Sequence, residues 1–306
     1  MFDHCGLKNQ LFGYLELLRP FTLLAPLIVS LGIIIASYFY NSITLDFFQV
    51  FWTTILPASL SMALLNGASN ALNQATDFKA DSISKPYRPI PKGIISIKNA
   101  KYLSVILYTL SIVLALSINT IFSIFVFCIV FFSLTYSLKP RMKDFLFINQ
   151  LWIAIPRGLI GILASWSVFG NPLQELPLTI GMIALLFLIG GSITKDIKDS
   201  DADKKTGTRT LVNMFGLRTA AFIALPFMFF PFATIPLMIN GGFLSEHFWS
   251  LTFLAIPAYV IFYLMIRNDS ESKILENTSA WSLMYITYFL FASCFSILTI
   301  LGTFIV

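Results

Sequence analysis

The sequence predicts an all-α membrane protein in which nine transmembrane helices surround a central cavity, with a cytoplasmic N-terminus and an outside C-terminus. Three observations support this fold class. The 306 residues are 57% hydrophobic and only 11% charged, with a mean hydropathy of +0.81, whereas soluble domains are about 25% charged. Nine apolar runs approach the roughly 20 residues that cross a bilayer. The basic residues lie on alternate connections between these runs.

The apolar runs are expected to be helices, because only helices and closed barrels satisfy the backbone polar groups within lipid. The runs are too long and too continuously apolar for barrel strands. Their approximate limits are 20–39, 51–75, 100–118, 120–138, 147–169, 177–195, 217–239, 248–266 and 281–305. Only Asn119 and Thr120 mark the hairpin between the third and fourth runs. Residues 1–306 are interpreted as a single domain.

The distribution of lysine and arginine predicts the orientation. Of the 20 basic residues, 19 lie in the N-terminal tail or after the second, fourth, sixth and eighth spans. The positive-inside rule therefore places these segments in the cytoplasm of a multi-pass protein of the cell membrane. The net charge of +5 favours anionic lipid and phosphorylated substrates as partners, and no nucleic acid is expected.

A first acidic cluster ends the second span and begins a cytoplasmic loop at about 76–99. Asn73, Asp77 and Asp81 stand at i, i+4 and i+8, so a helix would place them on one face. Carboxylate and amide oxygens suit Mg²⁺, which takes one or two carboxylates and completes its shell with water and phosphate. The alternative is a solvated helix end whose aspartates pair with Lys79 and Lys85.

A basic segment follows, Lys85-Pro-Tyr-Arg88-Pro-Ile-Pro-Lys92-Gly93. Its three prolines break any helix and hold the chain extended. Lys85 and Arg88 would then project beside the carboxylates. A metal site next to lysine and arginine is what a diphosphate group requires.

A second acidic cluster follows the sixth span, in a loop at about 196–216. Asp196, Asp199 and Asp203 stand at i, i+3 and i+7 and share a helix face, with Lys195 directly before them and Asp201 pointing elsewhere. Both clusters follow even-numbered spans, so they are expected at one level of the membrane. Such an arrangement can ionise an allylic diphosphate, because metal ions and basic groups stabilise the departing charge.

At these two segments the chain resembles the UbiA superfamily of intramembrane prenyltransferases. The pattern NxxxDxxxD is met by Asn73, Asp77 and Asp81, and the pattern DxxDxxxD by Asp196, Asp199 and Asp203, with Gly207 and Thr210 as the GxxT that follows. The basic segment is similar to that of the digeranylgeranylglyceryl phosphate synthase and chlorophyll synthase branches. The resemblance implies Mg²⁺, a polyprenyl diphosphate donor and a cavity that opens sideways to lipid.

Three further residues are candidates for substrate binding. Arg157, within the fifth span, is the only basic residue outside the N-terminal tail and the cytoplasmic loops, and a charge near the middle of a span costs at least about 2.5 kcal/mol. It should face the cavity, paired with the substrate or, in a structural role, with an aspartate. Tyr136 and Lys139 resemble family positions near the diphosphate, and the alternative is a pair of interfacial anchors.

The function expected from these residues is Mg²⁺-dependent transfer of a prenyl group, geranylgeranyl in particular, from its diphosphate to a lipophilic acceptor such as geranylgeranylglyceryl phosphate. An aromatic or tetrapyrrole acceptor is the alternative. A secondary transporter is a third interpretation, but it would carry its carboxylates near the bilayer midplane. The residues assigned to catalysis are Asp77, Asp81, Asp196 and Asp203; those assigned to metal binding are these four with Asn73 and Asp199; those assigned to substrate binding are Asn73, Lys85, Arg88, Tyr136, Lys139, Arg157 and Lys195.

Overall fold

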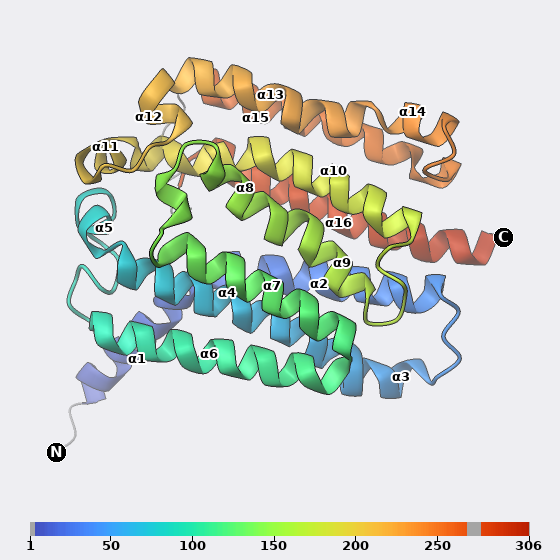
Figure 1. Ribbon diagram of the computed structural model, residues 1–306, viewed down its shortest axis with the longest axis horizontal. Helices are drawn as coiled ribbons and strands as arrows, with labels where there is room; N and C mark the ends of the chain where they lie inside the picture. Colours follow the sequence, from blue (N-terminus) through green and yellow to red (C-terminus); the bar gives the residue numbers. More distant parts are fainter. Residues whose placement is uncertain (1–3, 268–276, 306) are drawn as a thin grey trace.

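The computed structural model describes residues 4–267 and 277–305, and this part of the chain contains helices and no strand (Figure 1). The helices of the first half are α1 (His4–Leu18), α2 (Pro20–Tyr40), α3 (Phe47–Val50), α4 (Leu56–Thr76), α5 (Phe78–Ser84), α6 (Ile97–Ile118) and α7 (Thr120–Ser137). Those of the second half are α8 (Ile148–Ala154), α9 (Gly161–Trp166), α10 (Glu175–Gly191), α11 (Asp196–Thr206), α12 (Leu211–Phe215), α13 (Leu217–Ala233), α14 (Ile235–Asn240), α15 (Ala255–Arg267) and α16 (Ser279–Ile305). The all-helical prediction is confirmed.

Eight helical stretches of the described residues are long and apolar enough to cross a membrane. They match eight of the expected spans, and the π-helix η1 (Phe51–Ile55) extends α4 toward α3. The remaining expected span, 217–239, contains α13, an apolar helix of 17 residues. Thr234 separates α13 from α14. Seventeen residues lie at the lower limit of a membrane crossing, so the number nine stays a prediction.

The short hairpin between α6 and α7 is confirmed, and Asn119 explains how it forms. The Asn119 side chain accepts a 2.8 Å hydrogen bond from the backbone N–H of Phe122, which caps the start of α7. The Asn119 amide also donates to the backbone oxygen of Ser167 at 3.0 Å. One residue therefore ends α6, begins α7 and joins the hairpin to the segment after α9.

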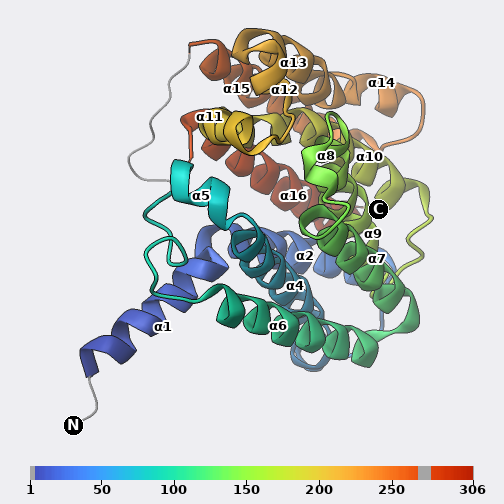
Figure 2. The same cartoon turned by 60° about the vertical axis from the view of Figure 1, so that its left-hand side comes forward.

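The two segments that carry the acidic clusters lie at the same end of the helix bundle. Helices α5, α11 and α12 lie at the left of Figure 1, whereas α3, α14 and the end of α16 lie at the right. Helix α5 packs against α11, although the two are far apart in sequence. Figure 2 shows the same pair side by side and shows α1 extending away from the bundle. The sequence expectation that both clusters share one level is consistent with this arrangement.

A break between α1 and α2 exposes backbone oxygens that side chains of α4 satisfy. Arg19 adopts a left-handed conformation with φ 55° and ends α1. Gln74 then donates to the backbone oxygen of Leu17 at 2.8 Å, and Asn70 donates to that of Leu18 at 2.9 Å. Carbonyl groups freed at a helix end need such partners where water is absent. These two polar side chains of α4 therefore stabilise the break between α1 and α2.

The fifth expected span contains a π-helix, η3 (Ile155–Ile160), between α8 and α9. Pro156 stands at its start and has no backbone N–H to donate, which favours a local departure from the α-helical pattern. Gly158 lies against α10 so closely that a Cβ atom would come within 2.7 Å of the Leu185 nitrogen. This close contact fixes the position of the neighbouring Arg157.

Candidate active site

A cavity of about 260 Å³ lies between the helices and includes residues from both acidic clusters among its walls. Asp77 and Asp81 line it from the first cluster, and Asp196, Asp199 and Asp203 line it from the second. The same cavity continues inward past Arg157 to Met62 and Ser165. It is thus ionic at the end formed by α5 and α11, and more apolar deeper in the bundle.

The first cluster keeps its helical spacing across a break in the helix. Asp77 separates α4 from α5 with φ −97° and ψ 10°. Its backbone N–H nevertheless donates to the oxygen of Asn73 at 2.9 Å, and the N–H of Asp81 donates to the oxygen of Asp77 at 2.9 Å. The three residues therefore stay one turn apart on the cavity side, as their spacing predicts.

The basic segment after α5 returns to this cluster. Arg88 donates to the Asp81 carboxylate at 2.7 Å, and both side chains are about 6% exposed. Burial raises the pKa of the Asp81 carboxyl above its usual value, although the Arg88 guanidinium acts in the opposite direction. The segment 85–93 folds into turns, so the predicted proximity of Arg88 to the carboxylates is found without an extended backbone.

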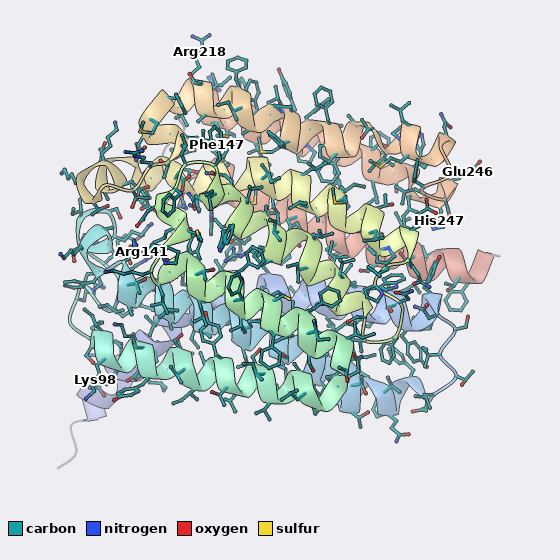
Figure 3. All side chains as sticks on the ribbon, in the orientation of Figure 1. Lys98, Arg141, Phe147, Arg218, Glu246 and His247 are labelled. Carbon is teal, nitrogen blue, oxygen red and sulfur yellow. The ribbon has the colours of Figure 1, made fainter. Side chains whose placement is uncertain are left out.

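Two basic residues that the sequence analysis did not assign also contact the first cluster. The Lys143 ammonium donates to the Asn73 side-chain oxygen at 3.0 Å and to the Asp77 carboxylate. Arg141 donates to Asp77 at 3.2 Å; Figure 3 labels Arg141 at the end of the bundle that carries α5. Burial lowers the pKa of the Lys143 ammonium, an effect that Asp77 opposes.

Lys139, which was assigned to substrate binding, is exposed and does not line the cavity. Helix α7 ends at Ser137, and the chain then turns through Pro140 and Arg141, which has φ 55°. This turn leaves Lys139 outside and carries Lys143 inward. Tyr136 does line the cavity, where its hydroxyl donates to the Asn149 oxygen at 3.2 Å.

The second cluster forms most of one face of α11. Asp196 is 2% exposed and accepts hydrogen bonds from Lys195 and, at 3.2 Å, from Gln150. Asp199 accepts from Lys85 at 2.5 Å, which links the second cluster to the basic segment. Asp203 lines the cavity one turn further on. The predicted i, i+3, i+7 face is thus directed at the cavity.

Asp144 joins the loop after α7 to the segment that follows α11. It accepts from the Arg141 guanidinium at 2.8 Å and from the Thr208 hydroxyl at 2.9 Å. Gly207 ends α11 with φ 84°, which a residue without Cβ adopts easily. Thr210 then caps α12 through a reciprocal pair of bonds with Asn213. The glycine and threonine of the GxxT pattern therefore shape the loop.

Arg157 lies deeper in the cavity, as its place in the fifth span predicts. Its guanidinium donates to the Tyr285 hydroxyl at 3.1 Å and lies 3.5 Å from the Asn66 oxygen. The expected aspartate partner is absent within the described residues, where no ion pair of Arg157 occurs.

No three His, Cys, Asp or Glu side chains of the described residues are close enough together to hold a metal ion by themselves. The carboxylates of Asp77, Asp81, Asp196 and Asp199 are instead paired with basic side chains. Two oxygens of the first cluster, from Asn73 and Asp77, converge on the single ammonium of Lys143. A cation that takes one carboxylate, one amide oxygen and phosphate oxygens fits this donor set.

Comparison with known proteins agrees with this geometry. The sequence profile described as the UbiA prenyltransferase family matches residues 23–284. The chain belongs to the UbiA prenyltransferase family. It is therefore a prenyltransferase, and the fold that surrounds the two acidic clusters is the UbiA fold.

The relatives include enzymes named digeranylgeranylglyceryl phosphate synthase. The Methanosphaera stadtmanae enzyme is 29% identical over 266 residues, which are 85% of this chain and 90% of that protein. The Methanosarcina mazei enzyme is 30% identical over 71% of this chain and 75% of its own length.

Solved structures show the fold. A UbiA homolog from Archaeoglobus fulgidus bound to GPP and Mg²⁺ has a TM-score of 0.70 at 20% identity, covering 96% of this chain and 100% of that one. A structure of digeranylgeranylglyceryl phosphate synthase has a TM-score of 0.65 at 22% identity, with 97% and 99% covered.

Proposed function

We propose that this member of the UbiA prenyltransferase family transfers a geranylgeranyl group from its diphosphate to geranylgeranylglyceryl phosphate, with Mg²⁺ as cofactor. The observation that carries the proposal is the convergence of two acidic clusters and five basic side chains at one end of a single cavity. The basic residues are Lys85, Arg88, Arg141, Lys143 and Lys195. The names of the relatives support the choice of donor and acceptor, and a solved relative with GPP and Mg²⁺ supports the metal.

The donor's diphosphate would lie between the two clusters. Asn73, Asp77 and Asp81 would hold metal from one side, and Asp196, Asp199 and Asp203 from the other. Bound there, Mg²⁺ would neutralise part of the diphosphate charge. Lys143 and Arg141 would exchange part of their contact with Asp77 for diphosphate oxygens. Guanidinium and ammonium groups bind such oxygens strongly.

The reaction exchanges one C–O bond for another and moves one proton. The bond between C1 of the allylic group and the diphosphate oxygen breaks, and the electron pair leaves with the diphosphate. The basic residues stabilise that charge where it develops. The acceptor hydroxyl oxygen then bonds to C1, its O–H bond breaks, and the proton passes to the released diphosphate. The deeper, apolar part of the cavity keeps water away from the allylic cation.

The membrane arrangement is part of the proposal. Residues 1–306 would form one domain of nine spans in the cell membrane, with the acidic end of the cavity toward the cytoplasm. The alternation of basic residues supports this orientation. Helix α13 with α14 would supply the seventh crossing. A transporter is disfavoured, because the carboxylates gather at one end of the bundle.

An acceptor comparison tests the proposal. Purified protein with Mg²⁺ and labelled geranylgeranyl diphosphate would be offered geranylgeranylglyceryl phosphate, hydroxybenzoate-like acids, dihydroxynaphthoate and chlorophyllide at equal concentrations. We expect labelled product with geranylgeranylglyceryl phosphate and none with the ring acceptors. If only a ring acceptor gives labelled product, geranylgeranylglyceryl phosphate is rejected as the acceptor and the aromatic or tetrapyrrole alternative is supported.

A further inference from the structure

Arg157 differs from the five basic residues at the acidic end of the cavity. Each of those five contacts a carboxylate at 3.2 Å or less. Arg157 lines the same cavity and is exposed to it, but its hydrogen bonds go to a tyrosine hydroxyl and an amide oxygen. A guanidinium with neutral partners inside a membrane span is costly. An anionic ligand in the cavity would offset that cost.

The depth of Arg157 separates it from the diphosphate position. Asn66, which the guanidinium contacts, precedes Asn73 by seven residues on α4. Seven residues correspond to about 10 Å along a helix. Asn73 contacts Lys143 at the level of the first cluster. A diphosphate at that level already has five cations beside it, so Arg157 is placed for a second anion.

The backbone and the side chain of Arg157 are held independently. The Tyr288 hydroxyl donates to the Arg157 backbone oxygen at 2.8 Å, and Tyr285, one turn earlier on α16, holds the guanidinium. The π-helix η3 surrounds the residue, and such turns are frequent at functional sites. The Tyr288 and Tyr285 bonds therefore both join η3 to α16. The guanidinium keeps further N–H donors for a ligand.

We propose that Arg157, oriented by Tyr285, binds the phosphomonoester headgroup of the acceptor. This assignment rests on the proposed function, in which the acceptor carries a phosphate. Two anions held about two helical turns apart repel each other less than adjacent ones, because each has its own cations. The acceptor hydroxyl would then lie between Arg157 and C1 of the donor.

The test compares acceptors that differ only in the phosphate. Purified protein with Mg²⁺ and labelled geranylgeranyl diphosphate is assayed with geranylgeranylglyceryl phosphate. The neutral alcohol, geranylgeranylglycerol, is measured as a competitor of the phosphate acceptor, so its binding is read from its inhibition constant whether or not it is itself prenylated. The variants are Arg157→Gln and Arg157→Lys. The control is Arg218→Gln on α13, which Figure 3 shows at the periphery and which is exposed.

Arg157→Gln should lower kcat/KM for the phosphate acceptor by about 100-fold, as loss of a buried charge pair does. The KM of the donor and the inhibition constant of the neutral alcohol should stay within about twofold of wild type, because neither ligand uses the guanidinium in this arrangement. Arg157→Lys should retain part of the activity, since it keeps the charge but loses the planar fork. Arg218→Gln should match wild type.

Equal weakening of both acceptor ligands would overturn the proposal in favour of a structural arginine. If Arg157→Gln raises only the KM of the donor, the proposal is overturned and Arg157 binds the donor diphosphate instead. If Arg157→Gln fails to fold in detergent, Tyr285→Phe carries the test and should raise the KM of the phosphate acceptor only; an unchanged KM would contradict the proposal. Failure of wild type to use geranylgeranylglyceryl phosphate would instead reject the proposed function.

Discussion

The ammonium group of Lys85 lies 2.5 Å from the carboxylate of Asp199, which follows it by 114 residues in the chain. The Lys85 side chain is 7% exposed and that of Asp199 is 26% exposed. This ion pair joins the segment after the first acidic cluster to the second cluster. It therefore fixes the separation of the two acidic clusters that line the cavity.

Replacing Lys85 with methionine should reduce activity strongly. The change leaves the Asp199 carboxylate without this partner in a mostly buried place, which costs about 3–5 kcal/mol for such pairs. It also removes a cation from the diphosphate position. We expect kcat/KM with geranylgeranyl diphosphate to fall at least about 100-fold, measured by radiolabelled product. Lys101→Met changes an exposed lysine on α6 and should leave kcat/KM unchanged; equal effects of the two variants would contradict this role.

Lys143 and Lys139 form a matched pair of lysines four positions apart. Lys143 contacts Asn73 and Asp77 in the cavity, whereas Lys139 is exposed outside it. Lys143→Met should raise the KM of the donor by at least about tenfold, since a charge-assisted bond to phosphate is lost. Lys139→Met should stay within about twofold of wild type, as surface substitutions usually do. If steady-state kinetics show a larger rise in the KM of the donor for Lys139→Met than for Lys143→Met, the loop after α7 binds substrate through Lys139.

Gln74 offers a test of stability apart from catalysis. It is 2% exposed and donates to the backbone oxygen of Leu17 at the break between α1 and α2. Gln74→Leu leaves that buried oxygen without its partner, which costs about 1–3 kcal/mol. The Tm in detergent should therefore fall by several degrees. Gln49→Leu changes an exposed glutamine and serves as control; an unchanged Tm for Gln74→Leu would mean that water satisfies the Leu17 oxygen.

The spacing of the acidic residues predicted much of the site, because spacing on a helix determines which side chains share a face. Asp77 interrupts the helix, yet the i to i+4 hydrogen bonds through it preserve the predicted stripe. On α11, Asp196, Asp199 and Asp203 also share the face that their spacing predicts, and all three line the cavity. Prediction succeeded where local backbone geometry alone decides the outcome.

The loop after α7 shows where such prediction ends. Lys139, Arg141 and Lys143 have the same sign and lie at the same membrane level, so the positive-inside pattern cannot distinguish them. The left-handed conformation of Arg141 decides which of them enters the cavity. The adjacent acidic residue, Asp144, was the available signal: a carboxylate within a basic run indicates a specific partner, here Arg141 and Thr208.

Asn66 and Asn70 show a second limit. Both lie on α4 within the second expected span, where a polar side chain needs a cavity or a partner, and the structure provides both. Each donates to a backbone oxygen near the break at Arg19 while also lining the cavity. The break lies at Arg19, directly before Pro20, and a proline disfavours the helical conformation of the residue that precedes it. The sequence does not show which side chains satisfy the backbone oxygens freed there.

The most direct test of the account measures product formation by Asp77→Ala, Asp203→Ala and Asp201→Ala, with Mg²⁺ and with EDTA. Asp201 is exposed on α11 and does not line the cavity, so it is the matched control. We expect the first two variants to lose at least about 100-fold in kcat, as removal of transition-state stabilisation does. The control and wild type should be active with Mg²⁺ and inactive with EDTA. Full activity of Asp77→Ala and Asp203→Ala, or wild-type turnover undiminished by EDTA, would contradict metal-assisted ionisation of the diphosphate.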